Sequence, residues 1–456
     1  MKRWVGKISV AYRLESEQIK FRLSYLYPMS QHNLSQRDQD HIWHPYTQMQ
    51  TAKAPIAIVK GQGTQLVDNV GKVYIDAISS WWTNLHGHGH PHIASRIAQQ
   101  ALQLEQVIFA GFTHAPAVEL AEQLLDLLPD NQNRVFFSDN GSTACEVAIK
   151  MALQYWYNHG AEKQTIIAFR DSYHGDTFGA MSISSRSAFT LPFADMLFRV
   201  EFVDVPTPGN EEETFSQLET LLRSGEVAAF IAEPLLLGTA GMLMYAPETL
   251  DSIISLCQKY DTLVILDEVL TGFGRTGKMF ASDYLTAQPD IMCFSKGLTG
   301  GFLPMGLTTS TEDVYDAFLS DDKMKTFFHG HSYTANPLGC AAGLASLEVF
   351  NQEDTLAKIA NIQAQHEAFA KLLANNKQVT GVRVLGTVIA FEVGEGGSYF
   401  HNLRDRMYDY FIERGVLLRP LGNTVYILPP YCITDAELDT VYHCIESLLT
   451  DLTNWQ

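Results

Sequence analysis

The segment VFFSDNGSTACEVAIKMALQYWYNHG, residues 135–160, contains one complete repeat of the pattern that decides the fold. It begins with a short apolar run, Val135 to Phe137, which is typical of a strand, and continues through a turn containing Gly and Ser. Apolar side chains then recur at the spacing of one helix face, at Val147, Met151, Ala152 and Tyr155. This order of strand, turn and helix predicts a mostly parallel sheet covered by helices.

Further apolar runs of strand length follow on the C-terminal side, namely TIIAF (165–169), AAFIAEP (228–234), LVILDEV (263–269) and DIMCFS (290–295). Each run continues into polar or glycine-rich residues. Because the carboxyl ends of parallel strands meet at one edge of a sheet, functional side chains are expected there.

The chain changes character after about residue 340. A helical segment, GCAAGLASLEVF, precedes the short strand candidates VIAFEV and TVYILPP and a closing helix. We therefore predict an α/β protein with a large domain over 79–335 and a smaller α+β domain built from 29–78 and 336–456. Residues 1–28 are predicted to be a disordered extension, or to precede a start at Met29.

The composition excludes several classes of protein. The chain has 456 residues, 46% hydrophobic and 18% charged, which is enough to bury a sizeable core. Its formal charge of −19 repels phosphate backbones and anionic lipids, so we expect no nucleic-acid or membrane partner. No apolar run approaches the roughly 20 residues of a membrane helix. The six cysteines form no C-x-x-C pair, which favours reduced thiols in a cytoplasmic protein.

Two charged residues at strand ends are candidates for chemistry. Asp267 ends the apolar run LVIL, where a buried carboxylate requires a cation, a metal or a protonated ring nitrogen as its partner. Lys296 ends the run from Ile291 to Phe294 and is followed by a glycine-rich stretch, so an apolar setting would lower its pKa and favour Schiff-base formation. A lysine whose amine simply reaches solvent from a strand end is the alternative.

The start of the helix in DNGSTACEVAIK is a candidate anion site. Gly141 and Ser142 open this helix, and the free N–H groups of a first helical turn bind phosphate well. Ordinary capping by Ser142 or Thr143 is the alternative. Taken together, a strand-end Asp, a strand-end Lys and a phosphate-binding turn are what pyridoxal phosphate (PLP) requires.

These motifs stand among others in a fixed order: WHPYTQM, SSWWTNLHGHGHP, SDNGSTACEVAIKMALQYW, YHGDTFGAMS, AEPLLLGTAGM, LDEVLTGFGRTGKMFA, SKGLTGG, FFHGHSY and LRPLGNT. From about Trp43 to Pro430 the chain resembles the class III pyridoxal-phosphate aminotransferases. The resemblance implies a fold-type I PLP-dependent transferase whose large domain binds the cofactor. It also implies a homodimer with active sites shared between the two subunits.

The resemblance implies roles for the cofactor-binding residues. Lys296 would bind the cofactor covalently and move protons, and Asp267 would pair with the pyridinium nitrogen. Gly141 and Ser142 would bind the phosphate, with Ser332 reaching it from the neighbouring subunit. His331 and Ser332 stand where some relatives have Pro and Thr, which makes the contacts of His331 harder to assign.

The resemblance also implies a substrate pocket. Tyr173 would stack on the cofactor ring, and Arg419 would bind a distal carboxylate by bidentate pairing. The remaining pocket residues would be Tyr46, Trp81, Trp82, Asp176 and Gly330. From the residues alone, Tyr173 and the two tryptophans also fit core positions, and Arg419 also fits a surface position beside a turn.

Within the family, the Trp-Trp pair, HPYTQM and YHGDTFGAMS favour the enzymes of biotin biosynthesis. The expected reaction is transamination of 8-amino-7-oxononanoate to 7,8-diaminononanoate, with S-adenosylmethionine as the amino donor. Lysine as the donor, or another class III ω-amino acid or diamine transaminase, are the alternatives. The alternating histidines from His86 to His92 lie in a Gly- and Pro-containing loop, so no metal site is expected.

Overall fold

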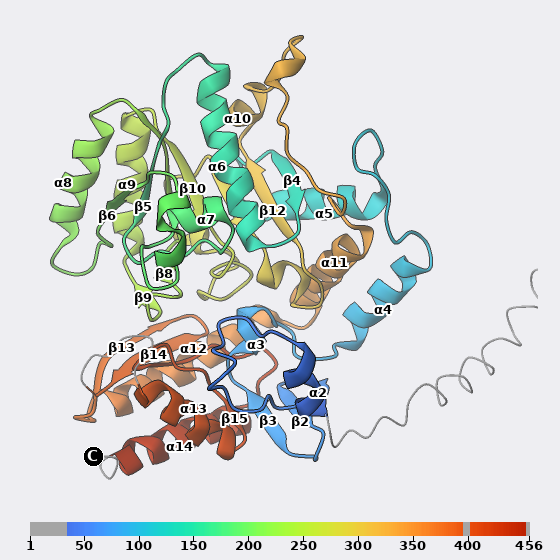
Figure 1. Ribbon diagram of the computed structural model, residues 1–456, viewed down its shortest axis with the longest axis vertical. Coiled ribbons are helices and arrows are strands. Elements are labelled where there is room, and N and C mark those ends of the chain that lie inside the picture. The colour runs from blue at the N-terminus through green and yellow to red at the C-terminus, as the bar shows by residue number, and fades with distance from the viewer. Residues whose placement is uncertain (1–33, 395–401, 453–456) are drawn as a thin grey trace, which may run out of the picture. The chain divides into compact units, whose positions relative to one another are not determined.

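The computed structural model describes residues 34–394 and 402–452, and the predicted extension over 1–28 lies outside these ranges (Figure 1). The described chain divides into two compact units. The first covers residues 34–60 and 66–73, and the second covers 61–65, 74–394 and 402–452. The first unit contains α2 (Leu34–His41) and most of β1 (Ile58–Gln62) and β2 (Gln65–Asp68).

A seven-stranded sheet forms the centre of the second unit. Its strand order is β4 (Arg134–Ser138), β12 (Gly306–Ser310), β11 (Ile291–Phe294), β10 (Leu263–Asp267), β7 (Val227–Ala232), β5 (Thr165–Phe169) and β6 (Glu201–Val203). β10 runs parallel to β11 and β7, and β5 runs parallel to β7 and β6. Only β12 is antiparallel to both of its neighbours in this sheet. The predicted mostly parallel sheet is therefore confirmed.

Helices cover both faces of this sheet, because its central strands are apolar on both sides. Ile265 on β10 packs in the cluster that contains residues of α6 (Gly141–Asn158) and α7 (Phe178–Ile183). Val264 and Leu266 point to the opposite cluster, with residues of α8 (Glu211–Leu222) and α9 (Pro247–Lys259). Figure 1 shows these helices around the upper sheet.

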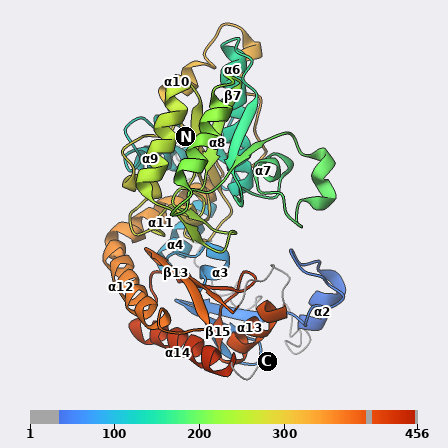
Figure 2. The same cartoon turned by 90° about the vertical axis from the view of Figure 1, so that its left-hand side faces the viewer.

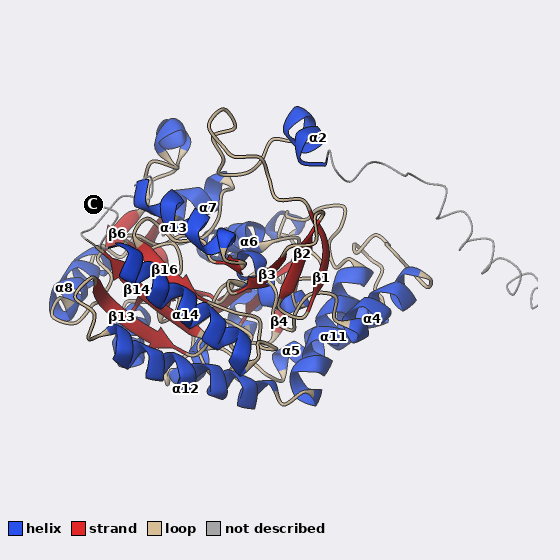
Figure 3. Ribbon diagram, turned by 90° about the horizontal axis from the view of Figure 1, so that it is seen from below, coloured by secondary structure: helices blue, strands red, loops and turns tan. Residues whose placement is uncertain are grey.

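The C-terminal part forms a smaller layer of helices and strands. β14 (Val388–Val393) pairs with both β13 (Val379–Leu385) and β16 (Thr424–Ile427) in an antiparallel sheet, and α12 (Thr355–Leu373) packs against it (Figure 3). Helices α13 (Asn402–Glu413) and α14 (Asp435–Leu452) complete this part (Figure 2). β15 (Val416–Leu417) pairs in parallel with β3 (Val73–Asp76).

Helix α11 (Pro337–Gln352) follows directly after the predicted domain boundary at residue 335 and packs against α4 (Pro91–Ala101), α5 (Ala115–Leu125) and η4 (Lys296–Thr299). The domain limits themselves stay a prediction.

The other short elements are α3 (Ser79–Trp82), η2 (Leu191–Met196), β8 (Leu236–Leu237), β9 (Leu243–Met244), η3 (Ala281–Tyr284), α10 (Glu312–Asp316) and η5 (Lys323–Lys325). Across the described part of the chain, no helix is both long and apolar enough for a membrane span.

Candidate active site

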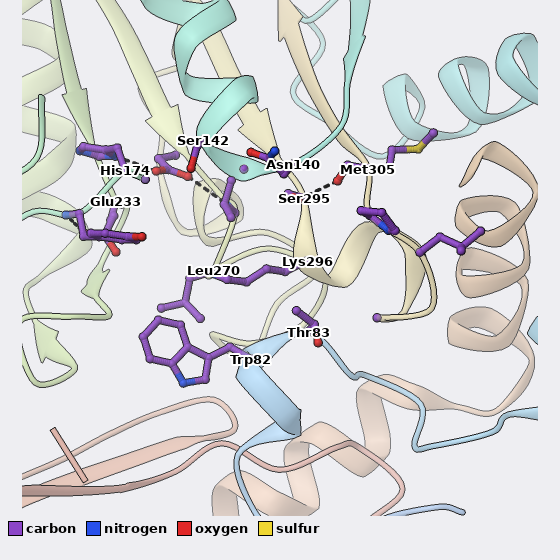
Figure 4. Close-up of a pocket in the computed structure, with 18 of the residues that line it drawn as sticks. Trp82, Thr83, Asn140, Ser142, His174, Glu233, Leu270, Ser295, Lys296 and Met305 are labelled. Atoms are coloured by element: carbon purple, nitrogen blue, oxygen red, sulfur yellow. Dashed lines mark hydrogen bonds and ion pairs between the residues drawn. The ribbon is translucent and has the colours of Figure 1, made fainter. Parts of the chain in front are cut away.

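A cavity of about 480 Å³ lies at the carboxyl ends of the central strands, beside the start of α6 (Figure 4). It brings together six residues that the sequence singled out: Trp82, Gly141, Ser142, Tyr173, Asp267 and Lys296. Its further lining residues include Asn140, His174, Glu233, Val269, Leu270 and the segment 301–305. Candidates separated by more than 200 residues in sequence thus share one cavity.

Asp267 is the last residue of β10 and is buried. Its Oδ2 lies 2.7 Å from His174 Nδ1 and accepts a hydrogen bond from Cys145 Sγ at 3.4 Å, while its Oδ1 accepts from Val269 N–H at 3.1 Å. Burial alone would lower the pKa of His174. The hydrogen bonds to Asp267 and Cys145 and the charge of Asp267 outweigh burial and raise this pKa to about 10. The raised pKa favours the protonated form of His174 beside the Asp267 carboxyl group.

Lys296 begins η4, immediately after β11 and Ser295. Its side chain extends across the cavity beside Leu270, and its Nζ lies 5.0 Å from the centre of the Trp82 ring (Figure 4). Burial lowers the pKa of Lys296, against the opposing charges of Asp267 and Glu233. The lysine faces the cavity rather than reaching away to bulk solvent, and a lowered pKa favours its neutral, nucleophilic form. Its backbone φ of 37° lies in the left-handed region, which non-glycine residues rarely adopt.

The start of α6 presents free backbone donors to the cavity. Asn140 is the N-cap: its side chain accepts from Thr143 N–H at 3.0 Å, and Thr143 Oγ1 accepts from Asn140 N–H at 3.1 Å. The Ser142 hydroxyl takes no part in this cap and instead accepts from Asp176 N–H at 3.2 Å. The amides of Gly141 and Ser142, in the first helical turn, have no carbonyl partner within the helix. This turn can therefore accept an anion.

Glu233, directly after β7, is a cavity residue that was not predicted from the sequence. It is buried, and its two carboxylate oxygens accept from Tyr173 N–H and Gly238 N–H, each at 3.0 Å. Burial raises the pKa of Glu233 to about 7. The position of the Glu at the end of the apolar run AAFIA was the available signal. His174 was also not among the predicted site residues, although it directly follows Tyr173, which was.

The two adjacent tryptophans have different surroundings. Trp82 is buried, lines the cavity, and donates from Nε1 to the hydroxyl of Tyr426 at 3.0 Å. Trp81 is 43% exposed and is not among the lining residues. The Arg419 guanidinium carbon lies 4.9 Å from the centre of the Trp81 ring, a cation–π arrangement. The turn that carries both tryptophans therefore places one ring in the cavity wall and the other beside Arg419, which is half-buried.

The other predicted site residues do not line the cavity of their own chain. Asp176 is exposed, and its backbone N–H is bonded to Ser142 as described above. Gly330 and Ser332 are exposed and His331 is half-buried, in the loop before α11, where the Ser332 carbonyl accepts from Gln106 Nε2 at 2.5 Å. Tyr46 belongs to the first unit, so its part in the substrate pocket stays a prediction.

The histidine-rich loop distributes its imidazoles among separate partners. His86 bonds Ser346, His88 bonds Asp76, His90 bonds Glu353 and His92 bonds Glu348. Among the described residues, the group with ligand atoms close enough for a metal ion is Cys145, His174 and Asp267, whose atoms lie within 4.8 Å of one another. A hydrogen bond with Cys293 and burial raise the pKa of the Cys145 thiol. The three side chains therefore form a hydrogen-bonded group around Asp267.

Comparison with known proteins agrees with this geometry. The sequence profile described as "Aminotransferase class-III" matches residues 46–449. The chain belongs to the class-III aminotransferase family. The chain is 48% identical to the adenosylmethionine-8-amino-7-oxononanoate aminotransferase of Synechococcus elongatus, over 90% of this chain and 99% of the relative. The enzyme of the same name from Geobacter sulfurreducens is 39% identical, over 91% and 97%.

Solved structures of class-III aminotransferases share the fold. The adenosylmethionine-8-amino-7-oxononanoate aminotransferase of Methanocaldococcus jannaschii has a TM-score of 0.87 and 35% identity, covering 92% of this chain and 99% of that one. A PLP-bound amine transaminase from an uncultivated Pseudomonas species has a TM-score of 0.84 and 29% identity, covering 90% and 98%. The protein is a PLP-dependent aminotransferase of fold-type I.

The residues of the cavity fit this cofactor. The amine of Lys296, the fixed carboxylate of Asp267 and the first-turn amides of α6, which have no carbonyl partner within the helix, match an aldehyde, a ring nitrogen and a phosphate. Gly175 leaves no room for a side chain beside the start of α6, since a Cβ there would lie 2.1 Å from Ser142 Oγ.

Proposed function

We propose that this class-III aminotransferase transfers an amino group from S-adenosylmethionine to 8-amino-7-oxononanoate, giving 7,8-diaminononanoate in biotin biosynthesis. The names of relatives up to 48% identical over 90% of the chain support this acceptor and this donor. The observation that carries the proposal is the position of Arg419 over Trp81, next to the cavity wall formed by Trp82. An aromatic residue in the cavity wall, with a guanidinium held by the tryptophan next to it in sequence, suits a long aliphatic chain with a terminal carboxylate.

The cofactor would be held by residues of three elements. Lys296 would bind it covalently, Asp267 would accept a hydrogen bond from its ring nitrogen, and the amides of Gly141 and Ser142 would bind its phosphate. When bound, PLP supplies the electron-withdrawing ring that makes the substrate Cα–H acidic. Lys296 Nζ, once released, would carry the proton, which requires the low pKa that burial gives it. Tyr173, held through its backbone by Glu233, would lie against the ring.

The acceptor would lie with its aliphatic chain between the aromatic walls and its carboxylate at Arg419. Trp82 and Tyr173 line the cavity, and Trp81 orients the guanidinium. Tyr46, Asp176 and Gly330 would complete the pocket. The same aromatic rings suit a sulfonium donor, since a cation over an aromatic face is stabilised by about 0.5–2 kcal/mol.

The proposal includes a cytoplasmic homodimer. Support comes from the loop of Gly330, His331 and Ser332, which does not contribute to the cavity of its own chain and would reach the phosphate in a second subunit. His331 Nε2 is buried with no hydrogen-bond partner among the described residues. The free, mostly buried cysteines suit a reducing compartment. Analytical ultracentrifugation should give the mass of a dimer, and a monomer would contradict this part of the proposal.

A substrate screen tests the proposed acceptor against the other class-III reactions. With PLP-loaded protein and S-adenosylmethionine as the donor, kcat/KM should be about 100-fold higher for 8-amino-7-oxononanoate than for the oxo acids formed from ornithine or 4-aminobutyrate, because only the first places a carboxylate at Arg419 across a long apolar chain. Comparable kcat/KM values for all three would instead support a general ω-amino acid transaminase.

A further inference from the structure

Asp76, which none of the proposed catalytic roles uses, is fully buried at the end of β3. Its Oδ1 accepts from Ile78 N–H at 3.1 Å, and its Oδ2 accepts from Ser80 N–H at 2.7 Å. The same Oδ2 lies 2.9 Å from His88 Nε2. One carboxylate therefore holds the backbone on both sides of Ser79, directly before the two tryptophans.

The backbone of this turn is strained. Ser79, Ser80 and Trp82 have φ values of 52°, 61° and 66°, in the left-handed region that residues with a Cβ rarely adopt. Such conformations persist only where surrounding contacts fix them. The contacts here are the Asp76 carboxylate and a hydrogen bond from Ser79 Oγ to the Leu428 carbonyl at 2.8 Å. In this backbone conformation, Trp82 lines the cavity and the Trp81 ring lies beside Arg419.

The strand that Asp76 ends also pairs with the segment that carries Arg419. In the parallel pairing of β3 with β15, Asp76 lies opposite Leu417, and Ala77 N–H donates to the Leu417 carbonyl at 3.2 Å. Arg419 follows two residues later in the sequence. The N–H groups of Ile75 and Ala77, on either side of Asp76, therefore hold the arginine segment, and the side chain of Asp76 holds the tryptophan turn.

We infer that Asp76 is a positioning residue that sets the aromatic wall and the Arg419 guanidinium relative to each other, and thereby the affinity for the acceptor. It acts through the backbone amides of Ile78 and Ser80. The inference rests on the proposed function, because it concerns how a long acceptor with a terminal carboxylate is held.

The variant Asp76→Asn tests this role. Asparagine keeps the shape of the side chain but replaces one acceptor oxygen by a donor, so it cannot satisfy Ile78, Ser80 and His88 together. The KM for 8-amino-7-oxononanoate should rise about 10- to 100-fold, the scale expected when a binding group is displaced by about 1 Å. The donor half-reaction with S-adenosylmethionine should change much less. Equal losses in both half-reactions, or an unchanged KM, would overturn the inference.

Asp251→Asn is the matched control. The Asp251 carboxylate likewise accepts backbone N–H groups, those of Thr286 and Ala287, each at 2.8 Å, but this loop does not line the cavity. Its replacement should leave the acceptor KM unchanged. A rise equal to that of Asp76→Asn would show a general loss of stability and would count against the inference.

The double variant Asp76→Asn/Ser80→Gly provides a rescue test. Glycine adopts a φ of 61° without strain, so the turn should keep its shape with weaker support from residue 76. The acceptor KM should recover most of its normal value, and the near-ultraviolet circular dichroism of the tryptophans should return to that of the parent. Failure of both to recover would contradict the role of strain.

Two further measurements separate the possible failures. If Asp76→Asn does not fold, Ser79→Ala, which removes the bond to Leu428, should raise the acceptor KM in the same direction but less, and no rise would overturn the inference. If the parent enzyme does not accept 8-amino-7-oxononanoate, the proposed function fails. In that case, the near-ultraviolet circular dichroism of Asp76→Asn and of Asp76→Asn/Ser80→Gly still tests whether Asp76 holds the turn. A changed tryptophan signal in the first variant that returns in the second supports this role, and an unchanged signal contradicts it.

Discussion

His174 Nδ1 lies 2.7 Å from Asp267 Oδ2, and both side chains are buried beside the cavity. The carboxylate of Asp267 is contacted by three groups, namely this imidazole, Cys145 Sγ and Val269 N–H, which come from three separate segments of the chain. A carboxylate held in this way is oriented before any ligand binds, which is the condition for strong electrostatic stabilisation in a site. The support of Asp267 is therefore part of the fold.

Replacing Asp267 by Asn should lower kcat by about 100-fold or more, the scale seen when a preorganised electrostatic group is removed. Asparagine keeps the shape but not the negative charge that would keep a pyridinium nitrogen protonated. Asp283→Asn is the control, because Asp283 accepts from Phe280 N–H at 2.9 Å outside the cavity. Steady-state kinetics and a thermal melt measure both variants. Parent-like activity of Asp267→Asn would assign the ring-nitrogen role to another residue.

The cofactor-free protein should lose stability at alkaline pH through His174. Its folded-state pKa is raised from 6.5 to about 10, so the folded protein keeps a proton that the unfolded chain releases. The stabilisation is complete below about pH 6.5 and is lost as the pH rises towards 10, with a size of the order of a few kcal/mol.

Urea unfolding at a series of pH values measures this effect. His174→Gln should remove the decrease in unfolding free energy between pH 6.5 and 10, and His443→Gln, on the exposed side of α14, is the control. If His174→Gln and the parent show the same pH dependence, the buried imidazolium does not exist.

Lys296→Ala should give a folded protein that still binds PLP non-covalently but has lost turnover by several orders of magnitude, because the covalent link and the proton carrier are the same amine. Absorbance spectra before and after borohydride reduction, with mass spectrometry, follow the covalent link. Lys358→Ala, at a pair with Glu353 on the surface, should behave like the parent. Normal turnover by Lys296→Ala would refute the assignment of the catalytic lysine.

Arg419→Ala should weaken binding of the acceptor by about 1.5–3 kcal/mol, the usual contribution of a hydrogen bond to a charged group. Arg414→Ala is a close match, since Arg414 also stacks on an aromatic ring, that of Tyr410, at 3.4 Å but in an exposed position. Rapid kinetics of the two half-reactions should show the loss in the acceptor step alone. A loss of the same size in the donor step would give Arg419 a structural role.

The strands with apolar residues on both faces could be read from the sequence. TIIAF coincides with β5, and LVILD with β10, because their side chains alternate between two apolar clusters. β12 was not predicted. Its sequence is GLTTS, and its buried hydroxyls are satisfied by specific partners: Thr308 donates to the Ala144 carbonyl and Thr309 to Gln132. A polar strand buried in this way gives no hydrophobic pattern.

The residues of the candidate site could be predicted where a residue type suited to the chemistry directly follows or ends a predicted strand. Lys296, Asp267 and the start of α6 meet this condition, and the structure brings them into one cavity. The different positions of Trp81 and Trp82 were not predictable, because they depend on positive φ angles in the turn that the Asp76 carboxylate stabilises. The support of Asp267 by His174 joins residues 93 positions apart, so no local pattern reports it.

The most direct test of the central claim follows the transferred nitrogen. The PLP-loaded enzyme is incubated with 8-amino-7-oxononanoate and S-adenosylmethionine labelled with ¹⁵N at its amino group, and the product is analysed by mass spectrometry. We predict 7,8-diaminononanoate carrying one ¹⁵N atom, with none formed by Lys296→Ala. Labelled product from ¹⁵N-lysine but not from S-adenosylmethionine would contradict the proposed donor, and no diaminononanoate with either donor would contradict the proposed function.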